Sequence, residues 1–76
     1  MPRIPPRSAR QVCKILEEHG FREIRQTGSH IQMQARIETE EGWTTITVPV
    51  PNHSEIPVGT IRRIIRLSQV PRESFE

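Results

Sequence analysis

A strict alternation of apolar and polar residues between His30 and Glu38 is the feature that most constrains the fold. Its apolar members are Ile31, Met33, Ala35 and Ile37, and its polar members are His30, Gln32, Gln34 and Arg36. Because successive side chains on a β-strand point to opposite faces, the alternation predicts a strand over 30–38 with one buried face. Other elements must cover that face, and the polar face stays open.

Two helices are expected, one before and one after the strands in the sequence. Ser8 with Gln11 three residues later is a capping-box signature, which predicts a helix over 9–19. The second helix is expected to open at Gly59-Thr60 and to end before Val70-Pro71. Its apolar stripe is Ile61, Ile64 and Ile65, and its outer face carries Arg62, Arg63 and Arg66.

Two further strands flank the alternating one. A short strand is expected over 23–26, before a turn at Thr27-Gly28. After a polar hairpin tip over 40–42, the β-branched residues of 43–48 favour a third strand. Pro49 and Pro51 are expected to end it, because proline cannot donate a ladder hydrogen bond.

The resulting order, α-β-β-β-α, predicts an α+β fold in which two helices pack on one face of a three-stranded antiparallel sheet. Residues 1–76 are expected to form a single domain, with the proline- and arginine-rich segment 1–7 as an extended arm. A last turn would place Phe75 against the core. No apolar segment is long enough for a membrane span, and the lone Cys13 excludes an intramolecular disulfide and fits a reducing cytoplasm.

Charge is distributed unevenly along the chain. Residues 1–25 carry six basic and three acidic side chains, residues 26–60 one and four, and residues 61–76 four and two. Ten of the eleven basic residues are arginines, whose guanidinium groups form bidentate hydrogen bonds with phosphate and stack on bases. This pattern fits a nucleic-acid ligand, and it fits a solvated basic surface equally well. The same two interpretations stay open for the outer face of the second helix.

The tripeptide Gly28-Ser29-His30 places a histidine at the start of the central strand, on its polar face. An imidazole changes charge near neutral pH and is suited to proton transfer. Gly28 is interpreted as a backbone requirement, either a positive φ or a close approach. Ser29 either closes the turn or orients the imidazole and contacts phosphate. Taken alone, the pattern favours an exposed strand histidine without a chemical role.

Four segments occur here in the order seen in HicA-type toxins, which are small mRNA interferases of bacterial and archaeal toxin–antitoxin pairs. These segments are Gly28-Ser29-His30, Thr47-Val48-Pro49, Asn52-His53 and Gly59-Thr60-Ile61-Arg62-Arg63-Ile64-Ile65. The sequence resembles this family from the Ser8 helix to Phe75. With this resemblance, a functional role for His30 is favoured over an exposed histidine without a role.

The resemblance implies a fold similar to a double-stranded RNA-binding domain. It also implies metal-independent cleavage of messenger RNA, without a cofactor, by the histidine of the triplet, which is His30 in this chain. The family's partner is a HicB-type antitoxin that covers the active face. A non-catalytic RNA-binding module of the same fold is the main alternative, and a protein–protein module is a third.

Within this interpretation His30 is the general acid or base, because RNA supplies its own 2′-hydroxyl nucleophile. The predicted RNA-binding residues are Gly28, Ser29, Arg25, Gln32 and Arg36. Arg36 lies six residues beyond His30, or about 20 Å at about 3.3 Å per residue, so it is a binding residue only. Three histidines, one cysteine and no aspartate lack the spacing of a zinc site, so no metal is expected.

Three other residues have two interpretations each. His53 is either a second proton-transfer group or, as favoured, a loop histidine hydrogen-bonded to the backbone. His19 is placed to contact the free carbonyls at the end of the first helix. Trp43 either stacks on a base or covers the edge of the core.

Overall fold

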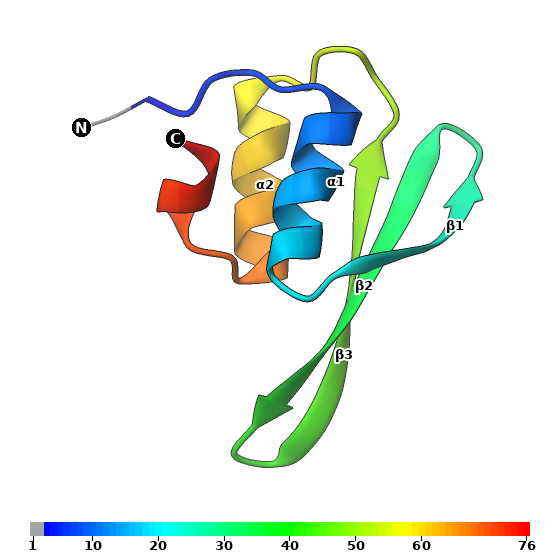
Figure 1. Cartoon of the computed structure of the whole chain (residues 1–76), viewed down its shortest axis with the longest axis vertical. Helices are drawn as coiled ribbons and strands as arrows, with labels where there is room; N and C mark the ends of the chain where they lie inside the picture. Colours follow the sequence, from blue (N-terminus) through cyan, green and yellow to red (C-terminus); the bar gives the residue numbers. More distant parts are fainter. Residues whose placement is uncertain (1–2) are drawn as a thin grey trace.

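A computed structural model describes residues 3–76 of the chain. Its elements are α1 (Ala9–Glu18), β1 (Arg22–Thr27), β2 (His30–Thr39), β3 (Gly42–Pro51), α2 (Val58–Ser68) and the 3₁₀ helix η1 (Arg72–Phe75). The strands form one antiparallel sheet in the order β1-β2-β3, and α1 and α2 lie side by side against it (Figure 1). The predicted α+β fold with α-β-β-β-α order is confirmed. No helix within residues 3–76 is long and apolar enough to cross a membrane.

The first helix begins as the capping box predicts. The Ser8 hydroxyl accepts a hydrogen bond from the Gln11 backbone N–H at 3.1 Å, and the Gln11 side-chain oxygen accepts one from the Ser8 N–H at 2.9 Å. Each bond satisfies a donor that the first turn would otherwise leave without a partner. At the other end, His19 Nδ1 lies 3.0 Å from the Ile15 carbonyl oxygen, which is the contact expected for it.

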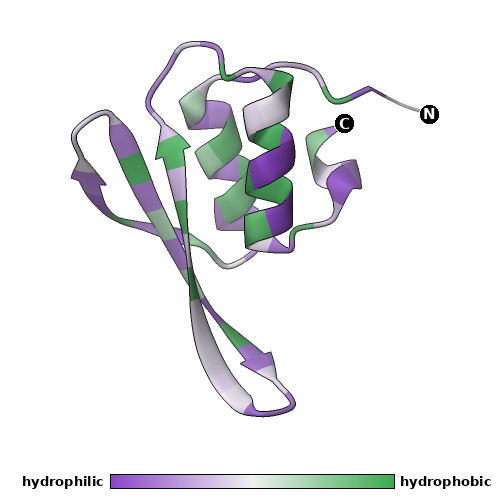
Figure 2. Ribbon diagram, turned by 180° about the vertical axis from the view of Figure 1, so that it is seen from behind, coloured by the Kyte–Doolittle hydropathy of each residue, from purple (hydrophilic) through white to green (hydrophobic). Residues whose placement is uncertain are grey.

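The core lies between the two helices and one face of the sheet. Its fully buried large side chains are Leu16, Met33, Ile56, Ile61, Ile64 and Phe75, together with Val12, Val48 and Val50. Hydrophilic and hydrophobic residues alternate as bands along β2 (Figure 2), and Met33 and Ala35 are buried as expected. Ile31 and Ile37 are only half-buried, because the helices do not cover the ends of this strand.

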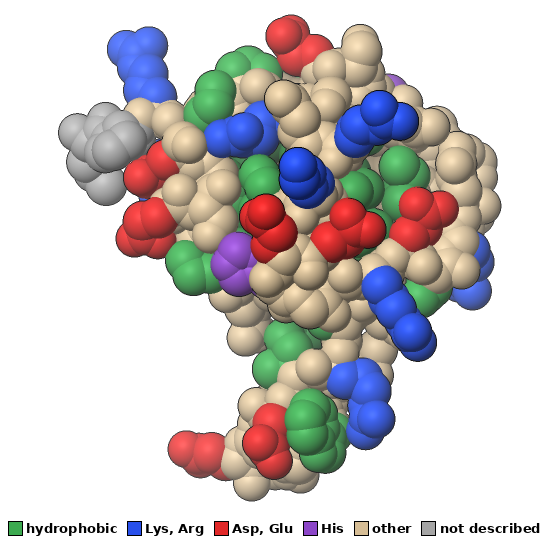
Figure 3. Space-filling model, viewed as in Figure 1, with side chains coloured by type: hydrophobic (Ala, Val, Ile, Leu, Met, Phe, Trp, Pro, Cys, Tyr) green, Lys and Arg blue, Asp and Glu red, His purple; other side chains and the backbone are tan. Residues whose placement is uncertain are grey.

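The far half of the β2–β3 hairpin projects beyond the helical body (Figure 1). β1 reaches only as far as the pair Arg22 and Gln34, so the ribbon beyond Gln34 has two strands. Acidic side chains gather at its end (Figure 3). Trp43 is 61% exposed there, with the guanidinium carbon of Arg36 5.2 Å from its ring centroid, so it does not cover the core.

The third strand is longer than predicted. The expectation that Pro49 ends it is wrong, because β3 continues through Pro49 to Pro51. The Asn52 N–H donates to the Ser29 carbonyl at 2.7 Å, so the alternating backbone nitrogens of Pro49 and Pro51 face away from β2. Since β3 is an edge strand, its prolines cost no ladder bond.

The segment that precedes α1 packs on the body from Ile4 onward, whereas residues 1–2 of the expected arm lie outside the described residues. Ile4 is 4% exposed and belongs to the core. The Arg7 guanidinium donates to the carbonyl oxygens of Phe75 and Glu76 at 3.0 Å each, and the Ile56 N–H donates to the Arg7 carbonyl at 2.7 Å. Both ends of the described chain are thereby joined at one side of the fold.

Candidate active site

The turn between β1 and β2 sets the position of His30. Thr27 and His30 are direct partners across the two strands, which leaves Gly28 and Ser29 as a two-residue turn. Gly28 has φ of +58° and Ser29 has no positive φ, which is the sign pattern of a type II′ hairpin turn. A Cβ at Gly28 would meet no atom within 4 Å. The glycine is therefore required for its backbone conformation and not for a close approach.

The turn is tied to the loop that follows β3. The Ser29 carbonyl accepts the Asn52 N–H, and the next residue, His53, donates its N–H to the Pro51 carbonyl at 2.9 Å. The His53 carbonyl in turn accepts the Ala9 N–H at 3.0 Å, at the start of α1. The backbone of His53 thus fastens the loop to the first helix, and its exposed side chain takes no part in the hollow described next.

His30 lines a hollow of about 210 Å³ at the edge of the sheet. The hollow is lined by His30, Pro49 and Pro51 from the strands and by Thr60, Arg63, Ile64 and Leu67 from α2. Thr60, Arg63 and Leu67 are three and four residues apart, so they form one face of α2 together with Ile64, which is next to Arg63. The open face of the sheet and the second helix meet here, and His30 lies at their junction.

The chemical groups around this hollow differ in kind. Pro49, Pro51 and Leu67 provide apolar walls, Thr60 a hydroxyl, His30 an imidazole and Arg63 a guanidinium. Among the described residues, no carboxylate side chain lines it. An imidazole exchanges protons near neutral pH, and a guanidinium forms charge-assisted hydrogen bonds with phosphate oxygens. The hollow is suited to proton transfer beside a bound anion.

The sheet places two of the other predicted residues near His30 and one far from it. Arg25 lies directly opposite Gln32 across β1 and β2, in the next row of the open face. Arg36 is opposite Thr45 in the projecting ribbon and is stacked on Trp43. The structure therefore groups His30, Arg25 and Gln32, and it separates Arg36 from them.

For Arg63 the sequence left two interpretations open, a solvated surface and a contact with RNA. Arg63 was grouped with Arg62 and Arg66 on one outer face of the second helix. The structure places Arg63 in the hollow with His30, whereas Arg62 lines a different hollow. The helical spacing of Thr60, Arg63 and Leu67 could have indicated that these residues share a face of α2. It does not indicate which strand that face contacts.

The thiol of Cys13 lies away from this hollow. Burial raises the pKa of the Cys13 thiol from its ordinary value of 9.0 to about 11, and the nearby charges of Glu23 and Glu17 act in the same direction. Cys13 is therefore a neutral thiol near pH 7. Within residues 3–76, no three His, Cys, Asp or Glu side chains gather as a metal site would require.

A comparison with protein families matches most of the chain. The family model described as the HicA toxin of bacterial toxin–antitoxin systems matches residues 9–70, from the first residue of α1 to two residues beyond α2. The matched range includes the β1–β2 turn, His30 and the α2 face that lines its hollow. Neither the curated proteins nor the solved structures yield a match.

Proposed function

The chain belongs to the HicA toxin family of bacterial toxin–antitoxin systems, and we propose that it is a metal-independent endoribonuclease that cleaves messenger RNA. His30 is its general acid or base. The observation that supports this proposal is that His30 and Arg63 line one hollow, where an imidazole that transfers protons would act beside a fixed positive charge.

The reaction needs little more than these groups. The 2′-hydroxyl of the nucleotide before the cleaved bond attacks the adjacent phosphorus, and the imidazole of His30 accepts its proton. The bond from phosphorus to the 5′ oxygen breaks, and that oxygen takes a proton from the imidazolium or from water. The products are a 2′,3′-cyclic phosphate and a 5′-hydroxyl. Arg63 stabilises the negative charge that builds up on the phosphoryl oxygens.

The open face of the sheet supplies further contacts. Arg25 and Gln32, in the row beside His30, bind the phosphate and the ribose of the neighbouring nucleotide. Gly28 and Ser29 present the histidine through the tight turn. Arg36, about 20 Å along the strand, contacts RNA at a distance from the cleaved bond or not at all.

A toxin of a toxin–antitoxin pair has an antitoxin as its partner. We propose that this partner is a HicB-type antitoxin that covers the open face and the His30 hollow. Because it would occupy the same surface as RNA, its binding and RNA cleavage exclude each other. Both reactions take place in the cytoplasm, where messenger RNA is available.

The test is cleavage of end-labelled RNA by the purified protein in the presence of EDTA. Wild type should cut the RNA, and His30→Ala should lower the rate about 10²–10⁴-fold, the usual contribution of a positioned acid or base. His53→Ala is the matched control, because it removes an exposed imidazole outside the hollow. RNA that is retained but not cut would identify a non-catalytic RNA-binding module, and RNA that is neither cut nor bound would exclude both functions.

A further inference from the structure

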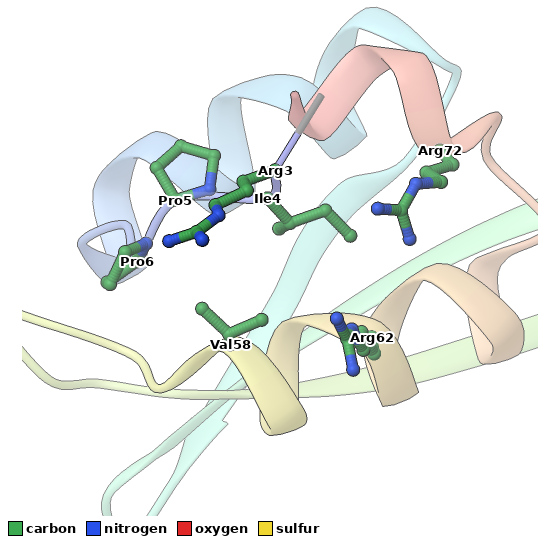
Figure 4. Close-up of a pocket in the computed structure, with 7 residues that line it drawn as sticks. All are labelled: Arg3, Ile4, Pro5, Pro6, Val58, Arg62 and Arg72. Atoms are coloured by element: carbon green, nitrogen blue, oxygen red, sulfur yellow. The ribbon is translucent and has the colours of Figure 1, made fainter. Parts of the chain in front are cut away.

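A second group of arginines surrounds two neighbouring hollows on another face of α2. The larger hollow has a volume of about 510 Å³ and the smaller about 250 Å³, and they share Arg62 and Arg72. Figure 4 shows Ile4 and Val58 inside the larger hollow, with the Arg62 and Arg72 side chains directed into it from α2 and η1. The arginines that line the pair are Arg3, Arg62, Arg66 and Arg72, and we call this surface the arginine groove.

Positive charge in the arginine groove is not fully compensated by the described residues. Arg72 pairs with the Glu76 carboxylate at 3.0 Å. Within residues 3–76, no carboxylate forms an ion pair with Arg3, Arg62 or Arg66, and α2 itself contains no acidic residue. On the face seen in Figure 3, by contrast, acidic and basic side chains lie close together over the helical body. A local excess of arginine attracts a polyanion.

The groove and the His30 hollow lie on adjacent faces of the same helix. Arg62 lines the groove and Arg63 lines the hollow. Arg62, Arg63 and Arg66 are all exposed, so the groove and the hollow each present guanidinium groups to solvent from α2. A ligand bound by Arg63 at the hollow can therefore extend over α2, about 10 Å in width, and meet positive charge along its path.

We propose that the arginine groove binds the phosphates of the single-stranded RNA that continues beyond the bond cleaved at His30. This inference rests on the proposed ribonuclease function, and it adds where the rest of the substrate lies. The guanidinium planes of the groove pair with phosphate oxygens or stack on unpaired bases, and Ile4 and Val58 contact the ribose. The position of the groove next to the His30 hollow, on the adjacent face of α2, favours RNA over an acidic protein segment as the occupant.

The experiment compares two double variants with equal loss of charge. Arg62→Gln with Arg66→Gln removes two groove arginines, and Arg10→Gln with Lys14→Gln removes two exposed basic residues of α1. The probes are a fluorescein-labelled 2′-O-methyl oligoribonucleotide, which cannot be cleaved, and a dinucleoside monophosphate, which is too short to cross α2. Binding of the first is titrated over several salt concentrations, and cleavage of the second is measured as a rate.

The groove variant should bind the oligonucleotide more weakly, and its slope of log K against log salt should be smaller by about 1.4 than that of wild type, from two lost phosphate contacts. It should cleave the dinucleotide at the wild-type rate, and the α1 variant should match wild type in both assays. Oligonucleotide binding equal to wild type, or an equal loss in the α1 variant, would overturn the proposal. A parallel loss of dinucleotide cleavage would do the same, because the groove would then belong to the catalytic site.

Two further outcomes separate this inference from the proposed function and from a protein ligand. If wild type does not cleave the dinucleotide, the ribonuclease proposal fails, and the binding titration still decides whether the groove holds RNA. If labelled polyglutamate binds wild type and loses affinity in the groove variant while RNA binding does not change, the groove is a site for an acidic protein segment and the proposal is wrong.

Discussion

His30 and Arg63 line the same hollow, although one lies at the start of β2 and the other in the middle of α2. Their proximity depends on how α2 packs along the edge of β3. The Ile61 and Ile64 side chains bury one face of the helix in the core, and this orientation turns the adjacent face, with Arg63, toward the strand edge. The arrangement of His30 and Arg63 around the hollow is therefore a product of core packing.

Arg63→Gln should lower RNA cleavage at least about tenfold, because it removes a charge-assisted contact with the phosphate and retains a helix-forming side chain. Thermal unfolding should not change, since the side chain is exposed. Arg10→Gln on α1 is the control and should cleave at the wild-type rate. Equal cleavage rates for the two variants would show that Arg63 does not contribute to RNA cleavage.

Cleavage by the wild-type protein should depend on pH between about pH 5 and 8, because an imidazole changes charge in that range. The measurement is the initial rate on dinucleotide substrate at constant ionic strength, so that salt-dependent RNA binding does not contribute. The residual rate of His30→Ala should not show the same dependence. A flat wild-type profile would contradict proton transfer by His30.

Gly28→Ala should destabilise the fold by about 1–2 kcal/mol, because alanine at φ of +58° is strained even though its methyl group has open space. Gly59→Ala is the matched control. Gly59 is helical, has no positive φ and also faces open space, so alanine there should be neutral or should stabilise by roughly 0.5 kcal/mol. The two unfolding midpoints in denaturant measure the difference, and equal midpoints would show that the turn does not need glycine.

Cys13 should react with iodoacetamide at pH 8 roughly 100-fold more slowly in the folded protein than in the denatured chain, because burial, assisted by Glu23 and Glu17, raises its pKa to about 11. The unfolded thiol loses its proton first as pH rises, so stability should fall between about pH 9 and 11. Glu23→Gln should speed the folded-state reaction. A folded protein that reacts as fast as the denatured chain would show that the thiol is not shielded.

Local sequence signals predicted the elements whose causes are themselves local. The capping box at Ser8 and the alternation from His30 to Glu38 depend on neighbouring residues, and both were confirmed. β3 can continue through Pro49 and Pro51 because their nitrogens face the side on which no strand pairs with it. The local sequence does not show which side that is. The half-burial of Ile37 likewise depends on how far the helices extend over the ribbon.

The candidate site was predictable only in part, for the same reason. The triplet that contains His30 is contiguous, so its turn and its strand position followed from the pattern. The packing of α2 against β3 brings Arg63 to the His30 hollow. The packing of the Ile4 segment against α2 forms the arginine groove. Such contacts join residues far apart in the chain, and helical periodicity cannot specify them.

The two prolines of β3 have a consequence for how molecules of this protein meet one another. Their nitrogens, which carry no hydrogen, face outward beside the mouth of the His30 hollow, so a neighbouring chain finds no amide donor there with which to begin sheet extension. This stretch of the rim resists edge-to-edge aggregation without any covering loop. The proposed RNA substrate does not bind through a backbone ladder, so these prolines would not hinder it.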